Sequence, residues 1–170
     1  GPVSLLPIVE VEMVYIEDAI EMEKVVKQYA SSANYIFMSA AVADYSPTNV
    51  ANNKIKRSDK NLKLNLTPSP DILKSIQGKT SAVITAFALE TKDGEEEAKR
   101  KLKEKKINFI VLNYANEKGA GFDSSTNRVV IFDKNENRFE INKDRKDRIA
   151  ERIIAHILQF AKQNKTVVNS

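Results

Sequence analysis

The sequence contains no cysteine, no tryptophan and only one histidine among its 170 residues. Without cysteine the chain can form no disulfide, no thiolate metal site and no cysteine nucleophile. The absence of cysteine is compatible with the reducing cytoplasm, which is the location we predict. A single histidine, His156, excludes a zinc site built from several histidines and argues against a Ser-His-Asp triad. Because His156 falls on the apolar side of a predicted helix, we expect it to pack rather than to catalyse.

Glycine is also scarce, with five residues in the chain. The sequence has neither the G-x-G-x-x-G fingerprint of dinucleotide-binding proteins nor a Walker A motif. This absence argues against a Rossmann protein that binds a nicotinamide cofactor in the standard way. The short sequence GAGF, at 119–122, is too degenerate to define a phosphate-binding loop.

Long apolar runs are missing as well. No stretch approaches the roughly 18 apolar residues of a membrane-spanning helix, and no basic segment leads into an apolar one as in a secretory signal. We therefore expect a soluble chain with no membrane partner. The 27 basic and 23 acidic residues leave a net charge of only +4. Because the cations lie on separate segments among many acids, we expect no nucleic acid partner either.

The chain is 42% hydrophobic, and its apolar residues follow strand and helix periods in turn. This length suits one core, and we predict a single domain over residues 1–170. Alternating strands and helices predict βαβ units. We expect an α/β, Rossmann-like three-layer fold with a mostly parallel sheet and a C-terminal β-hairpin, truncated at its N-terminus. Strands are predicted at 8–15, 35–43, 62–66, 82–88, 108–112, 128–132 and 138–141; helices are predicted at 16–30, from 69 onward, at 93–106 and at 144–161.

Ligands of such sheets lie beyond the carboxyl ends of the strands, and segment 39–57 leaves one of these ends. Its small residues let a ligand approach closely, and Asp44 could accept from an amine or hold a metal ion. Lys54, Lys56 and Arg57 would then lie on a loop over the site, with charges that suit phosphate oxygens. The alternative interpretation is a solvated loop with ordinary surface lysines.

The helix predicted at 93–106 offers a second cationic feature. Ala98 and Leu102 define its buried side, and Lys101 and Lys105 lie near that side, one turn apart. Their stems can be buried while their ammonium groups reach a cleft. In the alternative interpretation they bind nothing, and Lys101 pairs with Glu97.

A third feature is a helix start in the sequence TPSPDILKSI, at 67–76. Ser69 fits the N-cap, Pro70 the first turn, and Asp71 the positive end of the helix dipole.

The motifs SAAVADY, NKIKR, SPDIL, AFALET and GFDSSTN follow one another at spacings that closely resemble phosphopantothenoylcysteine synthetase. That family is often the C-terminal half of a bifunctional coenzyme A biosynthesis protein, and the resemblance covers essentially the whole chain. It implies a ligase. CTP activates the carboxylate of 4′-phosphopantothenate as an acyl-cytidylate, and the amine of cysteine then displaces CMP. The resemblance also implies Mg²⁺, a homodimer and a fused or partner decarboxylase domain.

The resemblance assigns roles residue by residue. Lys54 would be the catalytic loop lysine, with Lys56 and Arg57 completing the phosphate loop, and Asp44 would contact CTP or its metal. The other residues implied in nucleotide binding are Met38, Ser39, Ala40, Pro70, Asp71, Ile72, Leu73, Phe87, Lys101 and Lys105.

The sequence departs from the family pattern at its start. The Gly-rich turn and the Asn-Ser-Ser-Gly segment that family members carry before this point are absent, so we expect a fragment without its first βαβ unit. An alternative hypothesis is a non-catalytic α/β module for dimerisation or nucleotide binding.

Overall fold

The computed structural model describes residues 9–51, 53–57, 61–90, 93–114 and 125–168, the last five of them by their backbone alone. The chain forms two compact units that interleave along the sequence. The first unit comprises Gly1–Tyr29 and Ala40–Ile76, and the second comprises Ala30–Ser39 and Gln77–Ser170. The single domain expected from the sequence stays a prediction.

The second unit is built on a five-stranded sheet, in the order β1-β4-β5-β6-β7. Its strands are β1 (Tyr35–Met38), β4 (Val83–Glu90), β5 (Phe109–Tyr114), β6 (Thr126–Asp133) and β7 (Arg138–Arg145). The pairs β1–β4 and β4–β5 are parallel, whereas β6 runs antiparallel to both of its neighbours. Four of the five strands therefore point the same way, and the β6–β7 hairpin forms one edge. The predicted Rossmann-like fold is confirmed.

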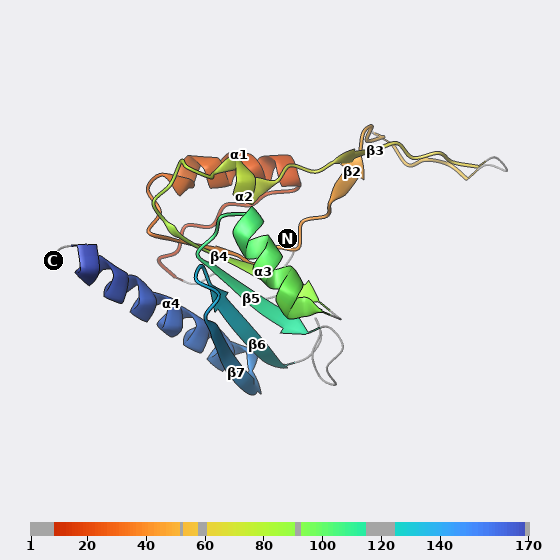
Figure 1. Cartoon of the computed structure of the whole chain (residues 1–170). Helices are drawn as coiled ribbons and strands as arrows, with labels where there is room; N and C mark the ends of the chain where they lie inside the picture. Colours follow the sequence, from red (N-terminus) through yellow and green to blue (C-terminus); the bar gives the residue numbers. More distant parts are fainter. Residues whose placement is uncertain (1–8, 52, 58–60, 91–92, 115–124, 169–170) are drawn as a thin grey trace. The chain divides into compact units, whose positions relative to one another are not determined.

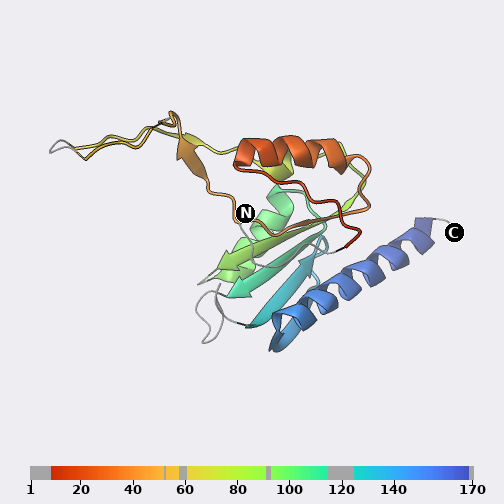
Figure 2. The ribbon, with the colours of Figure 1, turned by 180° about the vertical axis from the view of Figure 1, so that it is seen from behind.

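Two helices cover opposite faces of this sheet, as Figures 1 and 2 show. On one face α4 (Lys146–Val168) packs Ile149, Ile153 and Ile157 onto the sheet, where Phe109 and Ile141 are fully buried. On the other face lies α3 (Gly94–Glu104), whose Lys99 ammonium is 5.3 Å from the centre of the Phe132 ring. The buried residues of the α4 face are Phe109, Val111, Val129, Ile131, Ile141, Ile149, Ile153 and Ile157.

Close packing of α3 depends on Gly94, its first residue. Gly94 is buried, and a Cβ atom there would lie 3.0 Å from the Cβ of Glu90 and 3.5 Å from the Leu112 side chain. The missing side chain lets the helix begin directly beside the end of β4.

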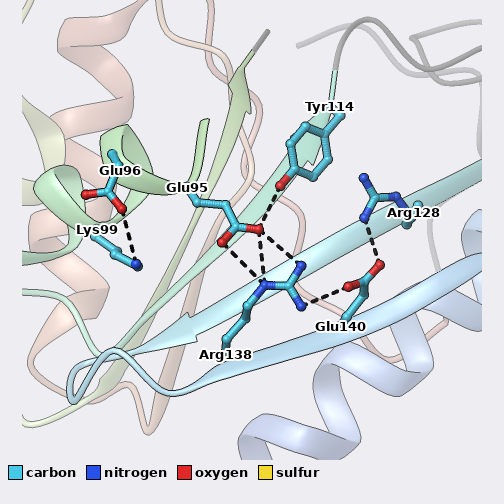
Figure 3. A network of polar contacts seen from close by, with 7 residues as sticks. All are labelled: Glu95, Glu96, Lys99, Tyr114, Arg128, Arg138 and Glu140. Carbon is cyan, nitrogen blue, oxygen red and sulfur yellow. Dashed lines mark hydrogen bonds and ion pairs between the residues drawn. The ribbon is translucent and has the colours of Figure 1, made fainter. Parts of the chain in front are cut away.

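A chain of ion pairs joins the first turn of α3 to the β6–β7 hairpin (Figure 3). Arg138 contacts Glu95 of α3 at 3.1 Å and Glu140 at 2.8 Å, and Glu140 also accepts from Arg128 at 2.7 Å. The Tyr114 hydroxyl donates to Glu95 at 3.1 Å. Partial burial, followed by this bond, raises the pKa of Tyr114. Because the charges are largely solvated, each pair contributes little stability and the network mainly fixes geometry.

His156 packs against aromatic rings, as the sequence predicted. Its ring stacks on Phe139 at 4.2 Å between centroids and meets the edge of Phe109 at 6.2 Å. Burial lowers the pKa of His156, and the charge of Asp133 opposes that shift.

This lowered pKa predicts a pH-dependent stability. The unfolded state takes up the proton near the ordinary pKa of about 6.5, before the folded state does, so the contribution is present above that pH. It is lost as the pH falls through the folded pKa. We expect urea denaturation to show a loss of stability between pH 7.5 and 5.5 that is smaller in His156→Gln. Equal losses in both proteins would contradict the prediction.

The first unit contains a helix, a short strand pair and a helical turn. These are α1 (Ala19–Ala30, whose last residue belongs to the second unit), β2 (Tyr45–Pro47), β3 (Leu66–Pro68) and α2 (Ile72–Ser75). β2 and β3 pair antiparallel, with Tyr45 opposite Pro68. The described residues between them run out and back as an arm, seen in Figures 1 and 2, and their side chains are exposed.

Two predicted strands are wrong. The segment predicted at 8–15 has no strand among its described residues, and its side chains are exposed, including Val9 at 85% and Tyr15 at 81%. The strand predicted at 62–66 retains only Leu66, within β3. Both segments alternate apolar and polar residues, but a strand also needs a neighbour whose backbone completes its hydrogen bonds, and alternation does not reveal that neighbour.

Other elements differ at their ends. The strand predicted at 35–43 stops at Met38, before its small residues, whereas β6 and β7 both extend beyond the predicted hairpin. The last helix continues to Val168 instead of ending at 161. Among the described residues, no helix has the length and apolar character that crossing a membrane requires.

Candidate functional site

The residues singled out from the sequence divide between the two units. The first unit holds Ala40, Asp44, the cationic loop residues Lys54, Lys56 and Arg57, and the segment Pro70–Leu73. The second unit holds Met38, Ser39, Phe87, Lys101 and Lys105. A single site that contains both groups is a proposal.

In the first unit the strand pair brings two sequence motifs together. The Ser69 amide donates to the Asp44 carbonyl at 2.8 Å, one residue beyond the pairing of Tyr45 with Pro68. Asp44 of the SAAVADY motif thus lies next to the SPDIL motif, although 25 positions separate it from Ser69 in the sequence. No pattern in the sequence indicated this strand pair.

The predicted cap of the following helix is corrected by the structure. Asp71, not Ser69, is the N-cap, because its carboxylate accepts from the Lys74 amide at 3.2 Å. The helix is only four residues long, Ile72–Ser75, and Ile72 is buried. Pro70 therefore precedes the cap instead of occupying the first turn. Asp71 is a good cap for the same reason as serine: its oxygen satisfies an amide that the helix leaves open.

The cationic loop lies on the exposed arm. Lys54, Lys56 and Arg57 are all exposed and belong to no helix or strand. Three positive side chains within four residues can gather around a polyanion without first being desolvated.

In the second unit, Lys101 is held by acidic neighbours. Its ammonium lies 2.6 Å from the Glu90 carboxylate, at the end of β4, and 3.8 Å from the predicted partner Glu97. Glu97 is bound more closely by Arg100, at 2.6 Å, which lowers the pKa of Glu97. The predicted buried side of this helix is confirmed, since Ala98 and Leu102 are 0% and 2% exposed.

Lys105 caps the end of the same helix. Its carbonyl accepts from the Gln77 side chain at 2.8 Å, and its residue is partly buried. Gln77 thus ties the end of the helix to the segment that leads into β4. The prediction that Lys101 and Lys105 bind a nucleotide is untested by these contacts and stays a prediction.

A pocket of about 280 Å³ opens in the second unit between the sheet and α4, near the carboxyl ends of β1 and β5 and the middle of β4. Ser39 and Phe87, both implied in nucleotide binding, line it together, whereas Met38 does not. On the sheet side it is lined by Phe37, Ser39, Phe87, Asn113, Asn127 and Val129. On the helix side it is lined by Lys146, Ile149, Ala150, Ile153 and Ile154 of α4.

An asparagine pair lies in this pocket that the sequence analysis did not identify. Asn127 donates from Nδ2 to Oδ1 of Asn113 at 2.8 Å. The positions of the two residues in the sequence could have indicated the pair. Asn113 lies near the end of β5 and Asn127 near the start of β6, and these strands are neighbours in the sheet. The loop between them, which includes GAGF and most of GFDSSTN, lies outside the described residues.

No metal centre forms from the described side chains, since nowhere among them do three His, Asp or Glu residues gather in positions that could hold an ion. Asp44 is therefore not part of such a cluster. A single carboxylate such as Asp44 can still contribute to a Mg²⁺ site, because Mg²⁺ is commonly coordinated by one or two carboxylates together with substrate phosphates and water.

The similarity to known proteins extends over nearly the whole chain. Residues 1–161 match the model of the DNA/pantothenate metabolism flavoprotein C-terminal domain. The coenzyme A biosynthesis bifunctional protein CoaBC of Bacillus subtilis (strain 168) is 34% identical over 165 residues, which are 96% of this chain and 41% of that protein. A cysteine/cysteine sulfinic acid decarboxylase from an unknown prokaryotic organism is 35% identical over 93% of this chain and 45% of its own length. The chain thus spans less than half of these curated relatives.

Solved structures give the same result. The crystal structure of the C-terminal domain of a CoaBC protein superposes with a TM-score of 0.77 at 31% identity, covering 95% of this chain and 74% of that one. A Cab2 mutant in complex with phosphopantothenate-cysteine shares the fold, with a TM-score of 0.63 at 18% identity, over 86% of this chain and 53% of that one. The resemblance predicted from the motifs is confirmed: the chain belongs to the DNA/pantothenate metabolism flavoprotein C-terminal domain family.

Proposed function

We propose that this chain carries the ligase step that joins 4′-phosphopantothenate to cysteine in coenzyme A biosynthesis. The observation that carries the proposal is the match of residues 1–161 to a family whose members include the CoaBC proteins. The pocket supports it, because Ser39, which directly follows the carboxyl end of β1, lines it together with Phe87 of the neighbouring strand β4, and ligands of such sheets bind beyond the carboxyl ends of the strands.

The proposed reaction proceeds in two displacements. A carboxylate oxygen of 4′-phosphopantothenate attacks the α-phosphorus of CTP, and the bond to pyrophosphate breaks. The product is an acyl-cytidylate. The cysteine amine then attacks the acyl carbon, the bond to CMP breaks, and the amine proton passes to solvent or a nearby base. The products are the amide, CMP and pyrophosphate.

In this proposal the charged residues stabilise the phosphates. Lys54 places an ammonium against charge that develops on the triphosphate, and Lys56 and Arg57 extend the same positive loop. Asp44 is the residue that would hold Mg²⁺, and the ion would supply further positive charge to the phosphates. Met38, Ser39, Ala40, Phe87, the segment Pro70–Leu73, Lys101 and Lys105 would contact the nucleotide.

Calorimetry with CTP, ATP and NAD tests the nucleotide assignment. We expect CTP to bind with the highest affinity, and we expect Lys54→Ala to weaken it, because one cation of the phosphate loop is then lost. An absence of preference for CTP together with unchanged binding in Lys54→Ala would remove the proposal.

We further propose that the protein is a cytoplasmic homodimer. We also propose that it is fused to a decarboxylase domain or acts together with one, as the word "bifunctional" in the name of the CoaBC relatives suggests. The exposed arm supports the homodimer. It and the strands at its base carry six large apolar side chains that are at least 56% exposed, and such surfaces commonly mark interfaces. They are Tyr45, Val50, Ile55, Leu62, Leu64 and Leu66.

Charged substitutions on this arm should therefore separate the subunits. We expect the double variant Val50→Glu/Leu64→Glu to halve the mass that light scattering measures, because two carboxylates would have to be buried without partners. Ile20→Glu is the matched control, since Ile20 is 67% exposed on α1. A wild-type protein that is already monomeric, or a double variant that stays dimeric, would count against the arm as the interface.

A further inference from the structure

Lys101, one of the residues implied in nucleotide binding, already contacts an anion of the protein itself. Its ammonium lies 2.6 Å from an oxygen of Glu90, the last residue of β4. Ligands of such sheets bind beyond the carboxyl ends of the parallel strands, so this ion pair lies at the ligand-binding end of the sheet. An anionic ligand that uses Lys101 therefore competes with Glu90 for the same ammonium.

The position of Glu90 is fixed by the packing of α3 beside β4. Its backbone is in register with Tyr114 of β5, and Gly94 begins α3 so near that a Cβ there would lie 3.0 Å from the Cβ of Glu90. The Glu90 side chain is only 20% exposed. Solvent and salt screen a partly buried charge less than a surface charge, so Glu90 is an effective counter-ion for its neighbour.

Glu97, the other carboxylate near Lys101, is bound by a different cation. Arg100 contacts both of its oxygens, from Nε at 2.8 Å and from Nη2 at 2.6 Å, and this contact lowers the pKa of Glu97. The nearer Glu97 oxygen is 3.8 Å from the Lys101 ammonium, which is beyond hydrogen-bond distance. Of the two carboxylates, only Glu90 is hydrogen-bonded to Lys101.

Lys101 can turn away from Glu90 without disturbing the helix. Ala98 and Leu102 form the buried side of α3, whereas the Lys101 side chain is 37% exposed. A lysine ammonium carries three donors on a flexible four-carbon stem, so it can exchange a carboxylate for a phosphate. A phosphate chain carries several negative charges and attracts the ammonium more strongly than one carboxylate does.

We propose that Glu90 is a positioning residue that acts through Lys101: it holds the ammonium at the end of β4 in the free protein and competes with the phosphates of the ligand for it. The inference rests on the proposed function, which brings Lys101 to a nucleotide. Glu90 lowers the affinity for that nucleotide, because the bound state has lost the Glu90–Lys101 pair. It also aids release, because the pair forms again when the phosphates leave.

Glu90→Gln is the direct test, because glutamine keeps the size of Glu90 and removes its charge. We expect calorimetry to show that CTP binds about three- to tenfold more tightly to this variant, since the phosphates no longer displace a carboxylate. Cytidine, which has no phosphate, should change in affinity less than about twofold. A merely structural role for Glu90 would instead weaken the binding of both ligands.

Two further variants test whether the effect depends on Lys101. Glu97→Gln is the matched control, because it removes the other carboxylate near the same ammonium, and we expect it to change CTP affinity less than about twofold. In a Lys101→Met background, Glu90→Gln should also change CTP affinity less than about twofold, because no ammonium remains to be released.

The outcomes separate this inference from the proposed function. Unchanged or weaker CTP binding in Glu90→Gln would overturn the role of Glu90, as would an equal gain in Glu97→Gln or in the Lys101→Met background. Inorganic tripolyphosphate is the second probe, because it carries the phosphate charges without the nucleoside. A wild type without preference for CTP, whose Glu90→Gln variant binds tripolyphosphate more tightly, would remove the proposed function and leave the role of Glu90 standing. A wild type that binds neither probe would overturn both.

Discussion

Replacing Lys54 with alanine is expected to lower the kcat of the ligase reaction by about 10²- to 10³-fold. The reason is electrostatic: a cation aimed at developing phosphate charge contributes on the order of 3–4 kcal/mol to the transition state, as other well-placed charge-stabilising groups do. Because Lys54 is exposed and lies outside the helices and strands, its loss should leave the fold intact. Steady-state assays of pyrophosphate release measure the effect, with thermal melting as the check on folding.

Lys63→Ala provides the control for that experiment. Lys63 is an exposed lysine on the same arm that no assignment places in the site. It removes the same charge from the same part of the chain, so we expect less than about a twofold change in kcat. Equal losses in the two variants would mean that the arm contributes only general positive charge, and the catalytic role of Lys54 would be withdrawn.

The second large effect concerns stability. Ile157→Ala should destabilise the protein by about 2–5 kcal/mol, because it removes buried methyl groups and leaves a cavity between α4 and the sheet. Ile157 is 0% exposed in the core beneath α4, whereas Ile154, one helical turn away, is 45% exposed. The same substitution at Ile154 should therefore cost under about 1 kcal/mol. Urea denaturation of both variants gives the comparison directly.

That comparison tests the layer architecture. Similar losses at both positions would mean that α4 does not present Ile157 to the sheet and Ile154 to its margin. A larger loss of stability in Ile154→Ala than in Ile157→Ala would mean that α4 presents Ile154, and not Ile157, to the sheet. A loss confined to Ile157→Ala is the outcome that the packing predicts.

The sequence predicts the second unit well because its elements carry strong local signals. The strands at Val83–Glu90 and Phe109–Tyr114 are mostly apolar, as is typical of strands buried on both faces. The helix at Gly94–Glu104 has Ala98 and Leu102 at helical spacing, and both are buried as expected. In these segments the period of the side chains, their burial and their partners all agree.

The strands of the first unit are predicted poorly for a physical reason. Each is three residues long and almost wholly exposed, so its side chains carry no burial pattern. Leu62 and Leu64 alternate with polar residues like a strand, yet they are 64% exposed and unpaired within the described sheets. Local periodicity reports which side chains could share a face, and it does not report which backbone completes the ladder.

The residues of the candidate site also divide into those that the sequence indicated and those that it did not. Resemblance selected Ser39, which directly follows β1, and Phe87 of β4, and both line one pocket. Asn127 ends the GFDSSTN motif, but neither periodicity nor motif pointed to its pairing with Asn113, because that contact forms across 14 positions between facing strands. Glu90, the partner of Lys101, was missed for a similar reason: the ion pair depends on the close start of α3 at Gly94.

The proposed ligase chemistry makes a direct prediction about one oxygen atom. If the carboxylate attacks the α-phosphorus of CTP and the amine then breaks the acyl–oxygen bond, one carboxylate oxygen must remain on CMP. Incubating the protein with CTP, cysteine and 4′-phosphopantothenate labelled with ¹⁸O in its carboxylate, and analysing the products by mass spectrometry, follows that atom. We predict one ¹⁸O in CMP for each amide formed. Amide formation with unlabelled CMP, cleavage of CTP to CDP, or no amide at all would contradict it.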